Sequence, residues 1–177
     1  MLQFYQSEEL VSDTYDSVSY VDLIEDVISM TVMDDSVEVA YIPENDTTLT
    51  TNEIALQQIL INLFTNAVKY SDKLKTVIKV QLISHPQEYE IIIRDNGMGI
   101  APDRIQSIFK LFYIATQEDR NGKQGTGIGL ATVARLLEHM HGKIEVSSEL
   151  GEWTEFKIFF RKKRYKKRRN KISTFLN

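Results

Sequence analysis

The sequence predicts an α+β fold, a two-layer α/β sandwich in which helices cover one face of a mixed, mostly antiparallel sheet. Helical and extended segments come in blocks instead of alternating strictly, which argues against a purely parallel sheet. Two pairs of extended segments are separated by short polar connections, the pattern of antiparallel hairpins. With 177 residues, 42% of them apolar, the chain is long enough for one domain with a full core.

The first part of the chain contains a predicted strand, a helix and a second strand. Residues 1–12 have apolar residues at roughly helical spacing and look like the end of a preceding helix. Residues 17–20 are a short strand candidate, and Asp22 can cap a helix that runs to about Met33. Residues 37–42 alternate between apolar and polar side chains, as a half-buried strand does.

The strongest helical signal follows Thr51 or Asn52, either of which can cap a helix. The next residues place an apolar side chain every three or four positions, at Ile54, Leu56, Ile59, Leu60, Leu63, Phe64, Ala67 and Val68. That spacing predicts a helix with one well-buried side.

The remaining strands are predicted to pair as hairpins. Residues 76–84 and 88–94 form the first hairpin, and three successive isoleucines at 91–93 suit a central strand. Residues 143–148 and 154–160 form the second hairpin.

Two further helices and a loop are expected between the hairpins. Pro102 opens a short helix that ends near Phe109. Residues 113–124 are polar and lack periodicity, which predicts a mobile loop. Residues 126–141 form a helix with Gly142 as its C-cap.

Composition narrows the class of protein. The absence of cysteine excludes a disulfide framework and a thiolate metal site. No run of 18 apolar residues is present to span a membrane, and the N-terminus lacks the pattern of a signal peptide. A cytoplasmic location is therefore expected, while a parent protein can still be membrane-anchored through other segments.

Charge is uneven along the chain. Residues 161–177 carry nine Lys or Arg and no acid, which leaves 12 of the 21 bases and all 25 acids elsewhere. This basic tail can contact nucleic acid or anionic lipid, or it can be a solvated tail or linker. The solvated tail is favoured because an acidic body repels a nucleic-acid backbone, so no nucleic-acid partner is expected. The folded domain is then predicted over residues 13–160.

Three polar residues interrupt the apolar pattern of the helix after Asn52. Asn62, Asn66 and Lys69 are four and three residues apart, so they project from one face. An amide oxygen is a hard, neutral ligand that can complete a Mg²⁺ shell filled mostly by phosphates and waters. A solvent face or a capping network is the plainer alternative, but a buried helix leaves its asparagines in need of partners.

The segment Asp95-Asn96-Gly97-Met98-Gly99 follows the predicted central strand. Asn-Gly is first of all a turn signal. Here, however, the chain leads on into a helix, and a carboxylate at the end of a central strand lies where pockets form. The carboxylate of Asp95 can accept a hydrogen bond from the amine of adenine, and glycines let the backbone approach the ring.

The segment Gly125-Thr126-Gly127-Ile128-Gly129 precedes the last predicted helix. Glycines at alternate positions expose backbone N–H groups, and the helix dipole favours anions there, although a flexible hinge is an alternative. Arg120 and Lys123, in the loop just before, can close over phosphates as a lid. Together the three motifs provide a metal-binding face, a buried carboxylate and a glycine cradle, which suits a nucleoside triphosphate.

The ordered motifs resemble the ATP-binding catalytic domain of bacterial sensor histidine kinases, within the fold shared with gyrase, mismatch-repair and chaperone ATPases. The resemblance covers about Tyr20 to Phe160. Its matching segments are residues 62–70 (N box), 95–100 (first glycine box), 109–112 (F box) and 125–130 (second glycine box).

This resemblance implies that ATP and Mg²⁺ are the cofactors, with Asn66 as the metal ligand, Tyr70 beside the adenine and Asp95 reading its amine. The implied ATP-binding residues are Asn62, Asn66, Lys69, Tyr70, Asp95, Gly97, Gly99, Ile100, Arg120, Lys123, Gly125, Thr126, Gly127, Gly129 and Leu130. Relatives that hydrolyse ATP carry a glutamate where this chain has Asn62, and an amide cannot accept a proton from water. Transfer of phosphate to a histidine is therefore favoured over hydrolysis.

Sensor kinases carry their phosphoacceptor histidine in a helical hairpin, and no such stretch occurs in these 177 residues. The resemblance then implies a partner, the phosphoacceptor (dimerisation) helical domain of the same parent kinase, with a response regulator receiver acting indirectly. No self-sufficient catalytic residue is expected in this chain. Because relatives dimerise through that hairpin, the isolated chain is expected to be a monomer.

Two other classes of function remain open. One is an ATP-driven conformational clamp, which Asn62 disfavours, and the other is an interaction module without nucleotide, which the intact glycine motifs disfavour. The segment Glu152-Trp153-Thr154 departs from relatives that often continue with glycine after Gly151. It is expected to lie away from the pocket and to affect only the hairpin.

Overall fold

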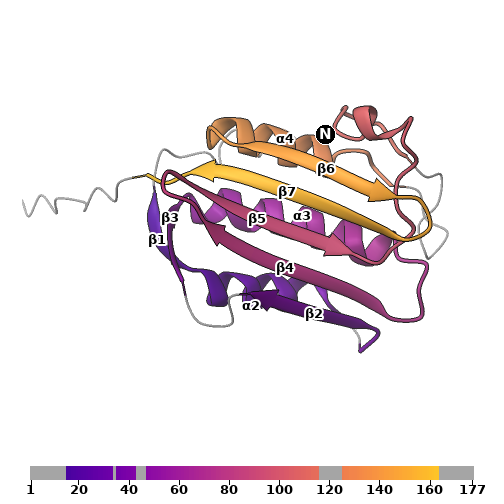
Figure 1. Ribbon diagram of the computed structural model, residues 1–177, viewed down its shortest axis with the longest axis horizontal. Helices are drawn as coiled ribbons and strands as arrows, with labels where there is room; N and C mark the ends of the chain where they lie inside the picture. Colours follow the sequence, from indigo (N-terminus) through magenta and orange to yellow (C-terminus); the bar gives the residue numbers. More distant parts are fainter. Residues whose placement is uncertain (1–14, 34, 43–46, 116–124, 164–177) are drawn as a thin grey trace, which may run out of the picture.

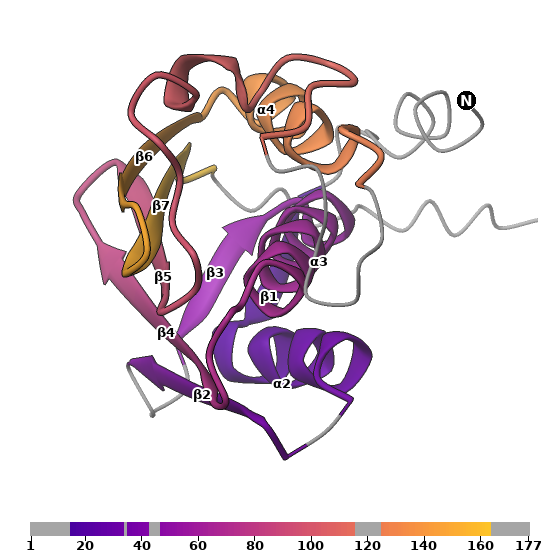
Figure 2. The ribbon, with the colours of Figure 1, turned by 90° about the vertical axis from the view of Figure 1, so that its right-hand side faces the viewer.

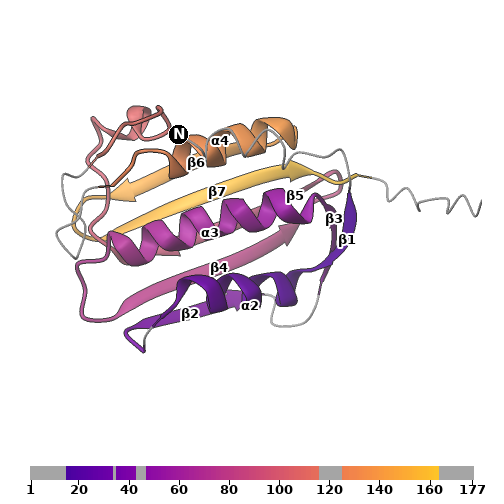
Figure 3. The same cartoon turned by 180° about the vertical axis from the view of Figure 1, so that it is seen from behind.

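A computed structural model describes residues 15–33, 35–42, 47–115 and 125–163. These residues form two layers (Figures 1 and 2), a five-stranded sheet and helices packed on one of its faces. The view from behind shows the helices α2, α3 and α4 in front of the sheet (Figure 3). The predicted fold class is confirmed.

The sheet has the strand order β2-β4-β5-β7-β6. Its strands are β2 (Val37–Ile42), β4 (Thr76–Ser84), β5 (Glu88–Asp95), β7 (Trp153–Arg161) and β6 (Lys143–Glu149). The β2–β4 pair is parallel, and the other neighbouring pairs are antiparallel. Strand β5 is central, and its Ile91 and Ile93 are buried against the helices, so both predicted hairpins and the predicted central strand are confirmed.

A separate two-stranded ribbon pairs β1 (Asp16–Ser19) with β3 (Thr48–Thr51) in antiparallel register. Strand β3 was not predicted, because its sequence Thr-Leu-Thr-Thr has a single apolar residue. That residue, Leu49, is fully buried in the core. One buried leucine and the pairing with β1 therefore stabilise a strand that alternation alone does not indicate.

Helix α2 (Tyr20–Thr31) begins earlier than the sequence predicted. Its N-cap is Ser19, whose Oγ accepts a hydrogen bond of 3.1 Å from the backbone N–H of Asp22. The prediction that Asp22 caps this helix is therefore wrong. Asp22 instead lies in the first turn, where its charge favours the positive end of the helix dipole.

Helix α3 (Glu53–Lys69) is the central helix of the second layer. Asn52 caps it, since its Oδ1 accepts a hydrogen bond of 2.9 Å from the backbone N–H of Ala55. The predicted apolar side is buried at Ala55, Leu56, Ile59, Leu60, Leu63, Phe64 and Ala67. Ile54, by contrast, is 52% exposed, because it lies in the first turn on the outer side.

Helix α4 (Gly129–His139) begins three residues later than predicted and ends in a left-handed residue. That residue is His141, with φ at 53°, and not the predicted Gly142. The backbone N–H groups of His141 and Gly142 turn back to carbonyls of the last helical turn. Gly142 is needed for another reason, because a Cβ there would lie 2.1 Å from the carbonyl oxygen of Phe159.

The helix predicted from Pro102 to about Phe109 is reduced to a single 3₁₀ turn, η1 (Ile105–Ser107). Successive three-residue hydrogen bonds along this segment form tight turns instead of a continuing helix. Of the predicted loop at 113–124, residues 113–115 have no regular structure and the rest lies outside the described residues.

Other expectations fall outside the described part of the chain. These are the helix remnant at residues 1–12 and the basic tail beyond residue 163. The domain boundaries at 13 and 160 stay predictions. Among the described helices, none has the length and apolar character needed to cross a bilayer.

Candidate functional site

A cavity of about 650 Å³ brings the three sequence motifs together. Its walls come from α3, the loop after β5, the start of α4, and β7 with the turn before it. Eleven of the predicted site residues line it: Asn62, Asn66, Lys69, Tyr70, Asp95, Gly99, Ile100, Thr126, Gly127, Gly129 and Leu130. Segments from positions 62 to 130 therefore meet in one hollow.

The polar face of α3 forms one wall. The Nδ2 of Asn62 donates a hydrogen bond of 2.9 Å to the carbonyl of Gln58, which leaves its Oδ1 beside the start of α4. A Cβ at Gly129 would lie 3.1 Å from that oxygen. The side chain of Asn66 lines the cavity and has no hydrogen-bond partner among the described residues. A half-buried amide without a partner is suited to receive a ligand.

Lys69 is the last residue of α3, and Tyr70 is its C-cap. The Nζ of Lys69 lies 5.3 Å from the centre of the Tyr70 ring, a cation–π contact. A Cβ at Gly125 would lie 2.6 Å from the Tyr70 hydroxyl and 3.4 Å from Lys69 Nζ. Gly125 is thus packed against both side chains, although it does not itself line the cavity.

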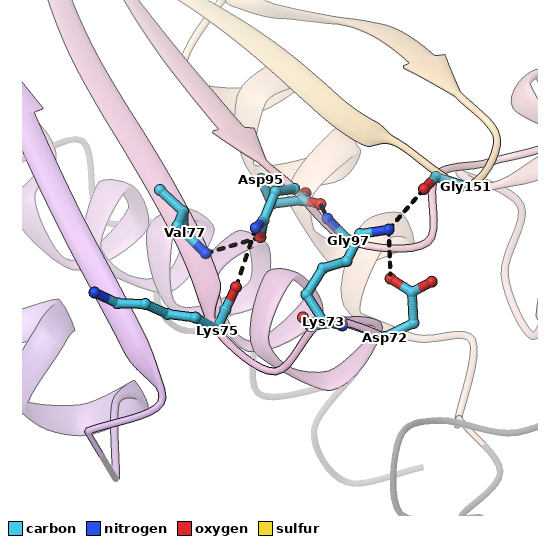
Figure 4. A network of polar contacts seen from close by, with 9 residues as sticks. Asp72, Lys73, Lys75, Val77, Asp95, Gly97 and Gly151 are labelled. Carbon is cyan, nitrogen blue, oxygen red and sulfur yellow. Dashed lines mark hydrogen bonds and ion pairs between the residues drawn. The ribbon is translucent and has the colours of Figure 1, made fainter.

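Asp95 is the last residue of the central strand (Figure 4), and it lines the cavity. The residue is 9% exposed, and its Oδ1 accepts a hydrogen bond of 2.8 Å from the backbone N–H of Gly97. Burial raises the pKa of Asp95 from 3.8 to about 6, against the lowering effect of backbone hydrogen bonds from Gly97 and Thr154. The folded protein therefore buries a carboxylate next to the cavity, although burying its charge is unfavourable.

The loop after Asp95 is held firmly. The side chain of Asn96 accepts from the backbone N–H of Val77 and donates to the carbonyl of Lys75, which fastens the loop to β4. Gly99 adopts φ at 66°, a left-handed conformation that glycine takes without strain. Gly97 does not line the cavity, but its N–H positions the carboxylate of Asp95.

The start of α4 forms the opposite wall. Its N-cap residue, Ile128, provides no side-chain hydrogen bond to the first turn. The N–H groups at this helix start therefore lack the side-chain acceptor that most helices have. Gly127 has φ at 65°, and a Cβ there would lie 2.5 Å from the backbone carbon of Phe112. An anion at this end would meet backbone N–H groups that the N-cap side chain does not cap, and the positive end of the dipole.

Several lining residues were missed by the sequence reasoning. They include Gln58, Met98, Arg104, Ile108, Tyr113, Leu150, Thr154 and Phe156. Thr154 pairs directly with Asp95 across β5 and β7. The expectation that residues 152–154 lie away from the pocket is therefore wrong at Thr154, and the register of β7 against β5 was the signal needed to find it.

Two predicted residues cannot be placed, since Arg120 and Lys123 lie outside the described residues. The residues that are described also lack any group of three or more His, Cys, Asp or Glu side chains that could hold a metal ion. The amide oxygens of Asn62 and Asn66 are neutral, so they suit a cation whose charge is met mainly by phosphates. The donor set therefore fits Mg²⁺ carried in with a nucleotide.

The chain matches a known protein family over the residues that form the cavity. Residues 51–164 match the family described as histidine kinase-, DNA gyrase B-, and HSP90-like ATPase. These residues include every segment that lines the cavity.

Individual relatives agree. Over 103 residues the chain is 39% identical to the sensor protein SrrB of Staphylococcus aureus (strain NCTC 8325 / PS 47), an alignment of 58% of this chain and 18% of that protein. The chain thus spans about a fifth of the length of the curated relatives it matches.

Solved structures share the fold. Full-length ShkA in complex with AMPPNP superposes with a TM-score of 0.71 at 25% identity, over 90% of this chain and 35% of that one. The mycobacterial sensor histidine kinase MprB gives 0.69 at 20% identity, over 85% of this chain and 99% of that one. The chain therefore belongs to the histidine kinase-, DNA gyrase B-, and HSP90-like ATPase family, in the form found in sensor histidine kinases.

Proposed function

We propose that this chain binds Mg·ATP in the cavity and presents the γ-phosphate to a histidine on a separate helical phosphoacceptor domain. One observation carries the proposal: a single hollow joins a buried carboxylate, the neutral amides of Asn62 and Asn66, and a helix start that its N-cap side chain does not cap. Each of these is costly or unusual alone, and a nucleotide would satisfy all three.

The base is expected at the Asp95 end of the cavity. A buried carboxylate that accepts a hydrogen bond from Gly97 still has acceptor capacity for the amine of adenine. Thr154 lies opposite Asp95 and contributes a backbone hydrogen bond that favours its charged form. Apolar lining residues such as Met98, Ile108 and Phe156 suit the faces of a purine.

The phosphates are expected at the α4 end. The N–H groups of its first turn, the glycines at 125–129 and the Nζ of Lys69 would meet their negative charge. Asn66, with Asn62 beside it, would hold the magnesium ion. That ion would neutralise charge that develops on the transferred phosphoryl group.

Transfer is favoured over hydrolysis by what lines the cavity. Asp95 is the single carboxylate among the described lining residues, and the proposal uses it for the base. Asn62, whose amide donates to the carbonyl of Gln58, cannot take a proton from water. Catalysis then consists mostly of positioning and charge neutralisation, and the attacking nucleophile must come from elsewhere.

The same proposal includes the partners, location and oligomeric state of the chain. The acceptor would be the dimerisation domain of the same parent kinase, with a response regulator receiving the phosphate afterwards. The nucleotide-binding chain would lie in the cytoplasm and be monomeric by itself.

Calorimetry and phosphotransfer together test the proposal. The chain should bind ATP more tightly with Mg²⁺ than in EDTA, and should show little steady hydrolysis. Added to the phosphoacceptor domain of its parent kinase, it should transfer labelled phosphate to form an acid-labile, alkali-stable phosphohistidine. Absence of nucleotide binding would refute the proposal, and a steady ATPase rate without transfer would favour a conformational clamp.

A further inference from the structure

The turn between β6 and β7 places an exposed leucine at the cavity. Leu150 is 64% exposed, yet it lines the hollow. Single exposed apolar side chains are ordinary on protein surfaces, so its exposure alone indicates nothing. Its location at the cavity is informative, because an apolar side chain at the mouth of a binding cavity can lose its hydration when a ligand enters.

Leu150 lies against the loop that carries Asp95. A Cβ at Gly99 would lie 2.9 Å from the Cα of Leu150, so the two backbones touch. The next residue, Gly151, donates its N–H to the carbonyl of Met98 at 2.7 Å. Leu150 is therefore at the Asp95 end of the cavity, where the proposed function puts the base.

The turn is also fixed from both sides. The Oγ of Ser148 accepts a hydrogen bond of 2.8 Å from the N–H of Ile100 and donates one of 2.7 Å to the carbonyl of Trp153. The Nζ of Lys73 donates to the carbonyl of Gly151 at 2.8 Å (Figure 4). These bonds hold the backbone around Leu150 in place before any ligand arrives, so little ordering cost remains for binding.

We propose that Leu150 covers the outer edge of the bound adenine and contributes affinity through the base alone. This inference rests on the proposed function. The leucine side chain supplies apolar contact, while Asp95 supplies the hydrogen bond that recognises the amine. The contribution is independent of the phosphates and of magnesium.

The test compares Leu150→Ala with Leu74→Ala by titration calorimetry. Leu74 is a matched control, because it is fully exposed and does not line the cavity. Loss of the leucine contact should weaken ATP, ADP and AMP alike, by about three- to tenfold. The heat-capacity change of binding should become less negative in Leu150→Ala, since less apolar surface is buried. Leu74→Ala should leave both quantities unchanged, and Leu150→Met should restore most of the affinity.

Structural and functional failures give different results. The nucleotide-free Leu150→Ala protein should unfold at the same temperature as wild type, because the side chain is largely exposed. Equal affinities in Leu150→Ala and wild type would overturn the inference while leaving the proposed function in place. A loss confined to ATP would overturn it as well, because it would point to the phosphates. Failure of the wild-type chain to bind any adenine nucleotide would end both.

Discussion

At the scale of single residues, the buried carboxylate of Asp95 has opposite effects on stability and on binding. Its carboxylate is buried, and the loss of hydration outweighs the backbone hydrogen bonds and the nearby charge of Arg94, so the pKa rises to about 6. Natural proteins accept such a cost at sites that bind ligands. The same side chain should therefore lower the stability of the free protein and raise its affinity for adenine.

Replacing Asp95 with asparagine separates these two effects. Asp95→Asn should weaken adenine-nucleotide binding by about 1–3 kcal/mol, because a charged hydrogen bond is lost. It should also stabilise the nucleotide-free protein at pH 7.5, because a buried charge is removed while Gly97 keeps an acceptor. Calorimetry and urea unfolding measure the two effects. Unchanged affinity would count against the assignment of Asp95 to the base.

The pKa of Asp95 also predicts how stability depends on pH. The folded protein holds this proton more tightly than the unfolded chain, whose pKa is near 3.8, so folding takes up a proton between about pH 4 and pH 6. Asp95 therefore lowers the free energy of unfolding above pH 6, and this destabilising effect vanishes below pH 4. Its size is at most about 2–3 kcal/mol.

Urea unfolding of wild type and Asp95→Asn across pH 4 to 8 isolates that contribution. The stability advantage of Asp95→Asn should be large at pH 7.5 and should shrink towards pH 4. Subtracting the two curves removes the other titrating groups that both proteins share. An advantage that stays constant with pH would show that the carboxylate is not destabilised by burial.

At the scale of elements, the end of α4 offers a direct test of backbone strain. His141 adopts φ at 53°, a conformation that costs an L-residue about 1–2 kcal/mol relative to glycine. His141→Gly should therefore raise the free energy of unfolding, by roughly 0.5–1 kcal/mol once the added flexibility of the unfolded chain is counted. Gly142→Ala is the contrasting variant, since its Cβ would meet the carbonyl of Phe159.

Chemical denaturation of both variants decides the point. His141→Gly should move the urea midpoint upward and leave the slope unchanged, while Gly142→Ala should move it downward by more. Should His141→Gly destabilise the protein, the left-handed residue would have to be another one.

The elements also show how far a sequence alone can be read. Helix α3 and both hairpins follow from periodicity, because their buried faces repeat at the spacing of the structure itself. Strand β3 and the cap at Ser19 could not be found this way, since each depends on a partner distant in sequence or on choosing between two nearby acceptors. The cap of α4 was assigned to a glycine that is needed for packing.

The site residues also fall into those that the sequence predicted and those that it did not. Asn66, Asp95 and Gly127 were predicted because each lies in a motif whose chemistry is local. Thr154 and Leu150 were missed, because they reach the cavity through the register of β7 and the turn before it. Residues that join a site by strand pairing need a three-dimensional arrangement that no spacing along the chain reveals.

At the scale of the whole molecule, the cavity connects both layers. The central strand provides Asp95, α3 provides Asn62 and Asn66, and α4 provides its N-terminus. A ligand bound to all of them stabilises the folded state as a unit, by about 2.7 kcal/mol at a concentration of 100 times Kd. Nucleotide binding should therefore raise the unfolding temperature of the entire domain in one transition.

Asn66→Ala should remove the part of this stabilisation that depends on magnesium. The Asn66 amide has no hydrogen-bond partner among the described residues, so its removal should cost the nucleotide-free protein little. The thermal shift produced by ATP with Mg²⁺ should fall to the shift produced by ATP in EDTA, which should itself be the same in variant and wild type. Asn66→Asp should also weaken the magnesium-dependent binding of ATP, because its negative charge would face the phosphates. Gln58→Ala, which changes another residue of α3 that lines the same cavity, controls for a general loosening of the helix. If Asn66→Ala kept the full magnesium effect, the cation would have to be held by other groups.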